Sequence, residues 1–165
     1  MKNNKVKFMC LAGIFAALVF VFTAYIHISV PPGYTHIGDG FIYLAASLLP
    51  LPYAASVGAI GALLADCLTG YALWAPASVI IKALTAMFFS AKTKNIIGAR
   101  NLLALIPSCA LCVGGYYLYE AIITQNFIAP SLGVVGNLIQ SALSSVLFVI
   151  LGIAMDKFGV KKKML

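Results

Sequence analysis

The chain has 165 residues, of which 62% are hydrophobic and only 9% are charged, and its mean hydropathy is +1.02. Soluble domains are about half apolar and about a quarter charged, so this composition excludes an ordinary soluble globule and indicates an integral membrane protein. The net charge of +7 does not indicate nucleic-acid binding, because the basic residues form short clusters between apolar segments, where they set membrane topology.

The first apolar segment, residues 8–28, follows Lys2, Lys5 and Lys7 and has the length of a membrane-spanning helix, roughly 20 residues. No A-x-A-like cleavage site follows it and further apolar segments do, so we expect a helix rather than a signal peptide. Residues 40–68 are long for one span and short for two, and the sequence LPLP at 49–52 interrupts them. The remaining predicted spans are residues 75–91, where Pro76 fits the first helical turn, 102–123 and 132–155.

The basic residues decide between five and six spans. With six spans, the clusters at residues 2–7, 92–100 and 157–163 share one side of the membrane and hold ten of the eleven Lys and Arg residues. With five spans, the first cluster would face the other two across the bilayer. We therefore predict one all-α membrane domain over residues 1–165, a bundle of six transmembrane helices with both termini in the cytoplasm of a prokaryotic cell.

Charged residues inside the predicted spans are candidates for function, because a charge at the bilayer centre costs about 2.5–3.5 kcal/mol and normally faces a cavity or a partner. The six-span topology places four of them in the outer half of the bundle: Asp39, Asp66, Lys82 and Glu120. The last span adds polar residues whose spacing puts them on one helix face: Asn137, Gln140, Ser141 and Ser144. Polar groups from five segments at one depth predict a small-ligand pocket that opens to the exterior.

Each of these residues also has a purely structural interpretation. Asp39 could cap the second helix. Asp66 and Lys82 lie on adjacent antiparallel helices, and the role of this pair could be limited to neutralising each other's charge. The polar face of the last helix could form interhelical hydrogen bonds. In the outer loops, Tyr71 and Trp74 fit an interfacial aromatic belt as well as ligand stacking, and His36 could be solvated rather than bound to a ligand.

The four cysteines, Cys10, Cys67, Cys109 and Cys112, lie in apolar segments. Cys109 and Cys112 form one C-x-x-C pair, but neither a second such pair nor a nearby His completes a zinc site. We expect them to be small packing residues, and we expect no metal and no cofactor.

Two stretches carry a resemblance to a known family: HIGDGFIYLAASLLP at residues 36–50 and GAIGALLADCLTGYALWAPASVIIK at 58–82. They resemble the S components of energy-coupling factor (ECF) vitamin transporters. The nearest branch is the riboflavin type, which includes proteins assigned to pyridoxine-like and hydroxymethylpyrimidine substrates. The rest of the chain agrees with that family only in length and number of spans.

The resemblance implies a six-helix bundle whose outward-facing pocket is capped by the loop after the first helix. It also implies partners, namely a transmembrane coupling subunit and two ATPase subunits. In AGIFA, Ala12 and Ala16 match the family's Ala-x-x-x-Ala motif for docking on the coupling subunit. The chain has no G-x-x-x-x-G-K-[ST] phosphate loop of its own, which fits this division of labour.

We therefore predict a substrate-binding subunit, not an enzyme, that captures a vitamin or related heterocycle from outside. The candidate substrate-binding residues are His36, Asp39, Tyr43, Asp66, Tyr71, Trp74, Lys82, Glu120, Asn137 and Gln140. The alternative is a self-sufficient proton-coupled carrier with Asp66, Lys82 and Glu120 as a relay, although the chain lacks the internal repeat of many such carriers. For a membrane enzyme, no acid pair, metal cluster or activated nucleophile stands out.

Overall fold

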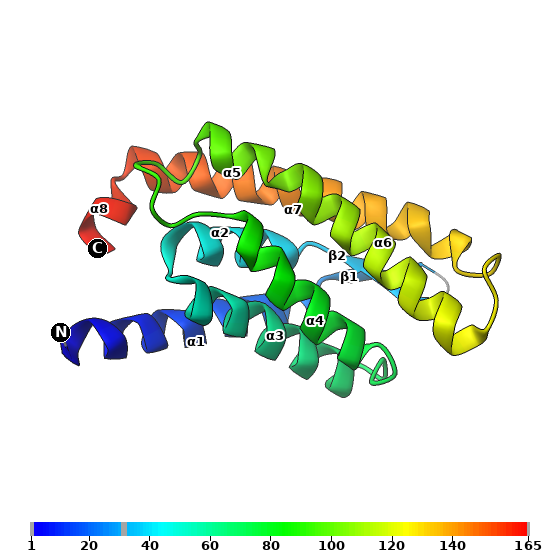
Figure 1. Ribbon diagram of the computed structural model, residues 1–165. Coiled ribbons are helices and arrows are strands. Elements are labelled where there is room, and N and C mark those ends of the chain that lie inside the picture. Colours follow the sequence, from blue (N-terminus) through cyan, green and yellow to red (C-terminus); the bar gives the residue numbers. More distant parts are fainter. Residues whose placement is uncertain (1, 31–32, 165) are drawn as a thin grey trace.

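The computed structural model describes residues 2–30 and 33–164, which form a helical bundle with one small β-hairpin (Figure 1). The two strands are antiparallel, with His27 opposite His36. In chain order, the elements are α1 Lys2–Ala24, β1 His27–Val30, β2 Gly33–His36, α2 Asp39–Leu48, α3 Leu51–Leu68, α4 Ala75–Thr85, the 3₁₀ turn η1 Ala86–Phe88, α5 Ala99–Leu103, α6 Leu105–Thr124, α7 Ser131–Lys157 and α8 Val160–Met164.

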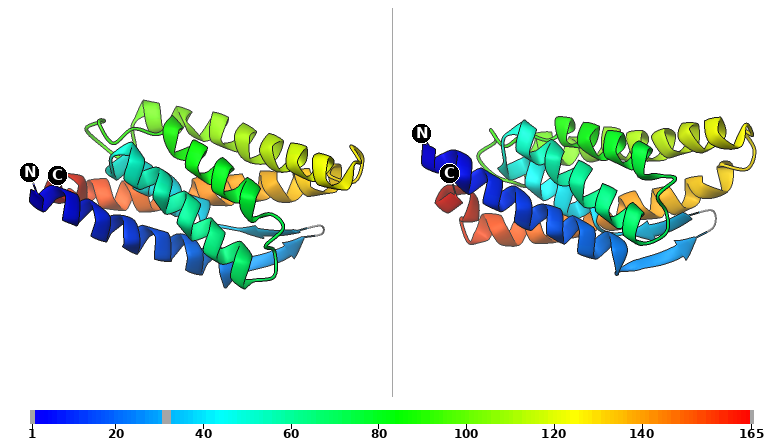
Figure 2. Two further views of the ribbon diagram at one scale, coloured as in Figure 1. Left: turned by 60° about the horizontal axis from the view of Figure 1, so that its bottom comes forward. Right: turned by 90° about the horizontal axis from the view of Figure 1, so that it is seen from below.

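The two ends of the bundle differ in what they carry. The N- and C-terminal helices α1 and α8 start and finish at the same end of the bundle, which we call the terminal end (Figures 1 and 2). The β-hairpin, the α3–α4 turn and the α6–α7 loop lie at the other, which we call the hairpin end. Helix α2 lies in the middle, where it contacts α1, α3 and α7, and all ten of its residues are buried.

The membrane class predicted from composition is confirmed, but the helices differ in length. In the part of the chain that the structure describes, four stretches are long and apolar enough to cross a bilayer: Asn4–Ala24, Leu51–Leu68, Ala99–Thr124 and Ser131–Lys157. The apolar stretches Asp39–Leu48 and Ala75–Phe88 are shorter. At about 1.5 Å per residue, α2 rises only about 15 Å, half of a hydrocarbon core of about 30 Å. The first helix also ends earlier than expected, because residues 27–30 form β1 instead.

Prolines set several of the helix boundaries. Helix α2 stops before Leu49, which is extended (φ −104°, ψ 152°), because a residue that precedes proline is disfavoured in the helical region. Pro52 lies in the first turn of α3 and Pro76 in the first turn of α4, positions that need no N–H donor. The interruption at LPLP and the helical start at Pro76 are therefore confirmed.

Gly58 sets how closely α3 and α4 approach each other. A Cβ at this position would lie 2.7 Å from the backbone carbonyl oxygen of Lys82, whereas a Cβ on Gly114 would meet nothing within 4 Å. Both glycines are helical, so Ala gains a similar helix propensity at each. We expect Gly58→Ala to be less stable than Gly114→Ala by about 1–3 kcal/mol, the usual cost of overpacking. Denaturant titration of both variants in detergent micelles measures the difference, and equal stability would contradict this contact.

Candidate functional site

A cavity lies at the hairpin end, between the hairpin, the α3–α4 turn and helices α4, α6 and α7. Its volume is about 50 Å³, which holds a few water molecules. A ring-sized ligand therefore enters only if the side chains at its wall move apart. The wall consists of Tyr34, Thr35, His36, Asp66, Tyr71, Trp74, Ser78, Tyr116, Glu120, Gly133, Gly136, Asn137 and Gln140.

Most of the candidate residues lie on this wall, and three do not. Asp39, Tyr43 and Lys82 are the exceptions. Several wall residues were not predicted from the sequence, although the spacing of two of them, Ser78 and Tyr116, indicates their position. Ser78 lies one helical turn before Lys82, and Tyr116 lies one turn before Glu120, so the i, i+4 spacing places each pair on one helix face. The hydroxyls of Ser78 and Tyr116 are 2.8 Å apart and hydrogen-bonded.

The turn after α3 places Asp66 and Tyr71 together on the cavity wall. Gly70 has a φ of +88°, in the left-handed region that glycine adopts at helix ends. The Tyr71 N–H donates to the Asp66 carbonyl oxygen at 2.9 Å, and the Thr69 N–H donates to that of Ala65. The bond from Tyr71 to Asp66 is the 6→1 bond of a Schellman-type helix end, so the segment "DCLTGY" folds back on itself locally.

Asp66 is tied to the β-hairpin. The Tyr34 hydroxyl donates to Asp66 Oδ1 at 2.5 Å. Burial and the adjacent Asp66 carboxylate raise the pKa of the Tyr34 phenol, so this hydroxyl stays protonated and remains a donor. The second carboxylate oxygen, Oδ2, is buried and has no hydrogen-bond partner among the residues that the structure describes.

Three aromatic rings lie in a row on the cavity wall. The ring centres of Tyr34 and Tyr71 are 4.5 Å apart, and those of Tyr71 and Trp74 are 5.8 Å apart. The Trp74 indole N–H donates to Glu120 Oε1 at 3.0 Å. Tyr71 and Trp74 therefore both contact other residues of the cavity wall.

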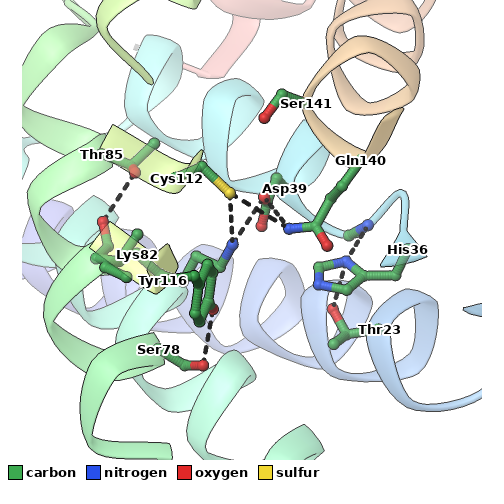
Figure 3. Close-up of polar contacts among 12 residues, drawn as sticks. Thr23, His36, Asp39, Ser78, Lys82, Thr85, Cys112, Tyr116, Gln140 and Ser141 are labelled. Atoms are coloured by element: carbon green, nitrogen blue, oxygen red, sulfur yellow. Dashed lines mark hydrogen bonds and ion pairs between the residues drawn. The ribbon is translucent and has the colours of Figure 1, made fainter. Parts of the chain in front are cut away.

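A buried ion pair lies behind the cavity, and it is not the predicted one. Lys82 Nζ lies 2.8 Å from Asp39 Oδ2, and both side chains are almost wholly buried. Gln140 Nε2 donates to the same oxygen at 2.9 Å (Figure 3). The expected pairing of Lys82 with Asp66 is wrong, because the central helix α2 brings Asp39 within reach of Lys82 while Tyr34 holds Asp66. Asp39 makes no side-chain capping bond on α2, whose N-cap is Gly38.

Tyr43 belongs to the hydrophobic core rather than to the cavity wall. Its ring stacks on Phe89, with centres 4.9 Å apart and planes 16° apart, and its edge contacts Phe148. The side chain is buried. Tyr43 lies in the middle of α2, which is buried on every face. Its predicted depth in the membrane alone therefore could not show that it lies outside the cavity wall.

His36 is a buried residue of fixed tautomer, so the interpretation as a solvated loop histidine is wrong. The Gly38 N–H lies 3.1 Å from His36 Nδ1, and the Thr23 hydroxyl lies 3.3 Å from the same atom (Figure 3). Because Nδ1 accepts, the neutral ring carries its proton on Nε2. Burial lowers the His36 pKa to about 4, so the ring is neutral near pH 7 and presents an N–H donor.

The polar face of α7 points inward as expected. Gln140, Ser141 and Ser144 are buried, and Asn137 lies on the cavity wall. The hydroxyls of Ser141 and Ser144 have no partner among the described residues. Gln140 connects this face to α2 through its bond to Asp39.

The predicted docking residues on α1 face the protein interior. Ala12 is 8% exposed and Ala16 is 9% exposed, and α1 packs along α3, where a Cβ on Gly61 would meet the Ala16 carbonyl oxygen. Ala12 and Ala16 therefore do not lie on the outer surface of α1, where a docking partner would have to meet them. The exposed face of α1 carries the next pair in the same spacing, Gly13 and Ala17.

The cysteines are free thiols. Within residues 2–30 and 33–164, no group of three or more His, Cys, Asp or Glu side chains is placed to hold a metal ion. What the described site offers a ligand is therefore hydrogen-bonding side chains, carboxylates and aromatic rings.

Residues 3–157 match the sequence model of the family described as "ECF-type riboflavin transporter, S component". No curated protein sequence matches the chain significantly.

Proposed function

Because the chain belongs to the family of ECF-type riboflavin transporter S components, we propose that it captures a vitamin-class heterocycle in the hairpin-end cavity and delivers it through an ATP-driven coupling module. S components are substrate-binding subunits of transporters rather than enzymes. The observation that carries the proposal is the cavity itself, where aromatic rings and hydrogen-bonding side chains from five elements meet. Such convergence is typical of small-molecule sites.

We further propose that the hairpin end faces the exterior of a prokaryotic cell, with both termini in the cytoplasm and six passes in one domain. The basic clusters support this orientation, because Lys92, Lys94 and Arg100 lie in and beside the loop at the terminal end, near the basic N- and C-terminal segments. The described turns at the hairpin end contain no Lys or Arg. Cytoplasmic loops carry the excess of basic residues.

Single cysteines introduced at exposed positions test this orientation. In a background free of the four native cysteines, we expect an impermeant thiol reagent to label Gln125→Cys but not Lys94→Cys in intact cells. Both residues are exposed. Gln125 lies in the α6–α7 loop at the hairpin end, and Lys94 lies in the loop between η1 and α5 at the terminal end (Figure 1). Lysed cells, in which both should react, are the control. Labelling of Lys94→Cys in intact cells would contradict the orientation.

Uptake in a host without its own transporter tests the function. Cells that express the chain together with an ECF coupling subunit and two ATPase subunits should accumulate radiolabelled riboflavin, pyridoxine or pyridoxamine, and cells that express the chain alone should not. Uptake by the chain alone that stops when a protonophore is added would instead support the carrier alternative. The proposed relay for that alternative is weakened already, because Lys82 pairs with Asp39 rather than with Asp66.

We propose that the exposed face of α1, which carries Gly13 and Ala17, docks on the coupling subunit in place of Ala12 and Ala16. Small residues at this spacing let helices approach closely in a membrane, and a Cβ on Gly13 would meet nothing within 4 Å. Gly13→Leu and Ala17→Leu should therefore reduce uptake by about tenfold or more while ligand binding to the isolated protein stays unchanged.

The exposed neighbour Ile14 supplies the matched control. Ile14→Leu conserves volume on α1 and should leave both uptake and binding intact. If Gly13→Leu and Ala17→Leu transport normally, this face does not dock.

A further inference from the structure

The cavity wall carries an excess of negative charge. Asp66 and Glu120 both lie on it, whereas Lys82 lies behind the Tyr116 ring, with Nζ 5.1 Å from the ring centre. The Lys82 ammonium is paired with Asp39. Among the wall residues that the structure describes, none is a Lys or Arg, and His36 is held neutral by burial and by the donors at its Nδ1. Two carboxylates therefore face the cavity without a matching cation on its wall.

Asp66 also presents an unused acceptor. Its side chain is buried, with the residue only 3% exposed. Tyr34 donates to Oδ1, while Oδ2 has no partner within residues 2–30 and 33–164. A buried carboxylate oxygen without a donor is costly, because it has lost its water without a replacement. A donor on a bound ligand would restore that hydrogen bond, and a charged donor would do so most strongly.

The aromatic rings on the wall suit the same kind of ligand. Tyr34, Tyr71 and Trp74 form a continuous row of aromatic contacts beside Asp66 and Glu120. The faces of such rings attract cations as well as planar rings. Carboxylates beside aromatic faces are thus complementary to a planar heterocycle that carries positive charge.

On the premise of the proposed function, we propose that the substrate is a heterocycle with a protonated amino group that donates to Asp66 Oδ2. The site then selects such a compound over the neutral alcohol of the same ring, which is a weaker donor. It rejects phosphate esters, because a phosphate would meet two carboxylates with no cation to balance it.

Three compounds with one ring test this selection: pyridoxamine with an aminomethyl group, pyridoxine with a hydroxymethyl group at the same position, and pyridoxine 5′-phosphate. Titration calorimetry of the full chain in detergent micelles should show that pyridoxamine binds at least about tenfold more tightly than pyridoxine, with the phosphate ester weaker still. Tighter binding of pyridoxine, or no binding of pyridoxamine up to about 1 mM, would overturn the proposal.

Variants separate a charge effect from a structural one. Asp66→Asn keeps an acceptor for Tyr34 and removes the charge, so it should weaken pyridoxamine by about tenfold and change pyridoxine by less than about threefold. Glu120→Gln, which keeps an acceptor for Trp74, should weaken pyridoxamine in the same direction and remains informative if Asp66→Asn does not fold. Unchanged pyridoxamine affinity in either folded variant would overturn the proposal.

The outcome also separates this inference from the proposed function. Riboflavin that binds more tightly than pyridoxamine, with affinity unaffected by Asp66→Asn, would overturn the inference while leaving vitamin capture intact. Failure of coupled uptake for every compound would instead overturn the proposed function.

Discussion

Replacing Lys82 by Met is expected to destabilise the protein by about 3–5 kcal/mol, because it leaves Asp39 charged and buried without its partner. The Lys82 ammonium lies 2.8 Å from Asp39 Oδ2, and both side chains are at most 3% exposed. Met nearly preserves the volume of the Lys stem, so the loss comes from the charge and not from a cavity. Denaturant titration in detergent micelles measures the change.

Double variants identify the partner of Lys82. Asp39→Asn combined with Lys82→Met should recover most of the lost stability, because it removes the unpaired acid and keeps an oxygen that can accept from Gln140. Asp66→Asn combined with Lys82→Met is the matched control and should recover none. If the Asp66 double variant recovers and the Asp39 variant does not, the pairing is wrong.

Replacing Asn101 by Ala is expected to cost about 2–4 kcal/mol, because it leaves buried backbone groups without partners. Asn101 is fully buried. Its Oδ1 accepts from the Ser90 N–H at 2.9 Å, and its Nδ2 donates to the Ile96 carbonyl oxygen at 2.9 Å. These bonds hold the loop between η1 and α5, where Asp156 also accepts from the N–H groups of Ile96 and Ile97.

Asn95 offers the matched control for this loop. It is exposed, so Asn95→Ala should change the free energy of unfolding by less than about 0.5 kcal/mol. Because Asn101 is remote from the cavity wall, Asn101→Ala should lower stability without changing the affinity of the folded protein for a bound heterocycle. Loss of affinity at full stability would contradict a structural role.

Helix positions and the depth of polar residues were predictable from the sequence. Apolar segments located the helices, and LPLP located the break between α2 and α3 because proline disfavours the helical conformation in the residue before it. Counting from the helix ends placed Asp66, Glu120 and Gln140 at one depth, and all three line the cavity. These inferences depend only on distance along a helix.

The sequence did not show which face of each helix is buried, nor which helices pack against one another. From Phe8 onward, helix α1 has apolar residues on all its faces, since lipid-facing and core-facing positions both favour apolar residues in a bilayer. Its sequence therefore could not distinguish the buried pair, Ala12 and Ala16, from the exposed pair, Gly13 and Ala17. The Asp39–Lys82 pair was not predicted for a related reason. It forms because α2 lies at the centre of the bundle, and the sequence of a helix does not show which other helices surround it.

The fluorescence of Trp74 tests the central claim that a small heterocycle binds in the hairpin-end cavity. Trp74 is the single tryptophan of the chain and lies on the cavity wall. Titration with pyridoxamine, pyridoxine and riboflavin, corrected for absorption by the added compound, is compared with equilibrium dialysis of the same compounds. The account predicts a saturable change in Trp74 emission whose midpoint matches the dissociation constant from dialysis for at least one compound. Binding by dialysis with no change at Trp74, or no binding of any of the three, would contradict it.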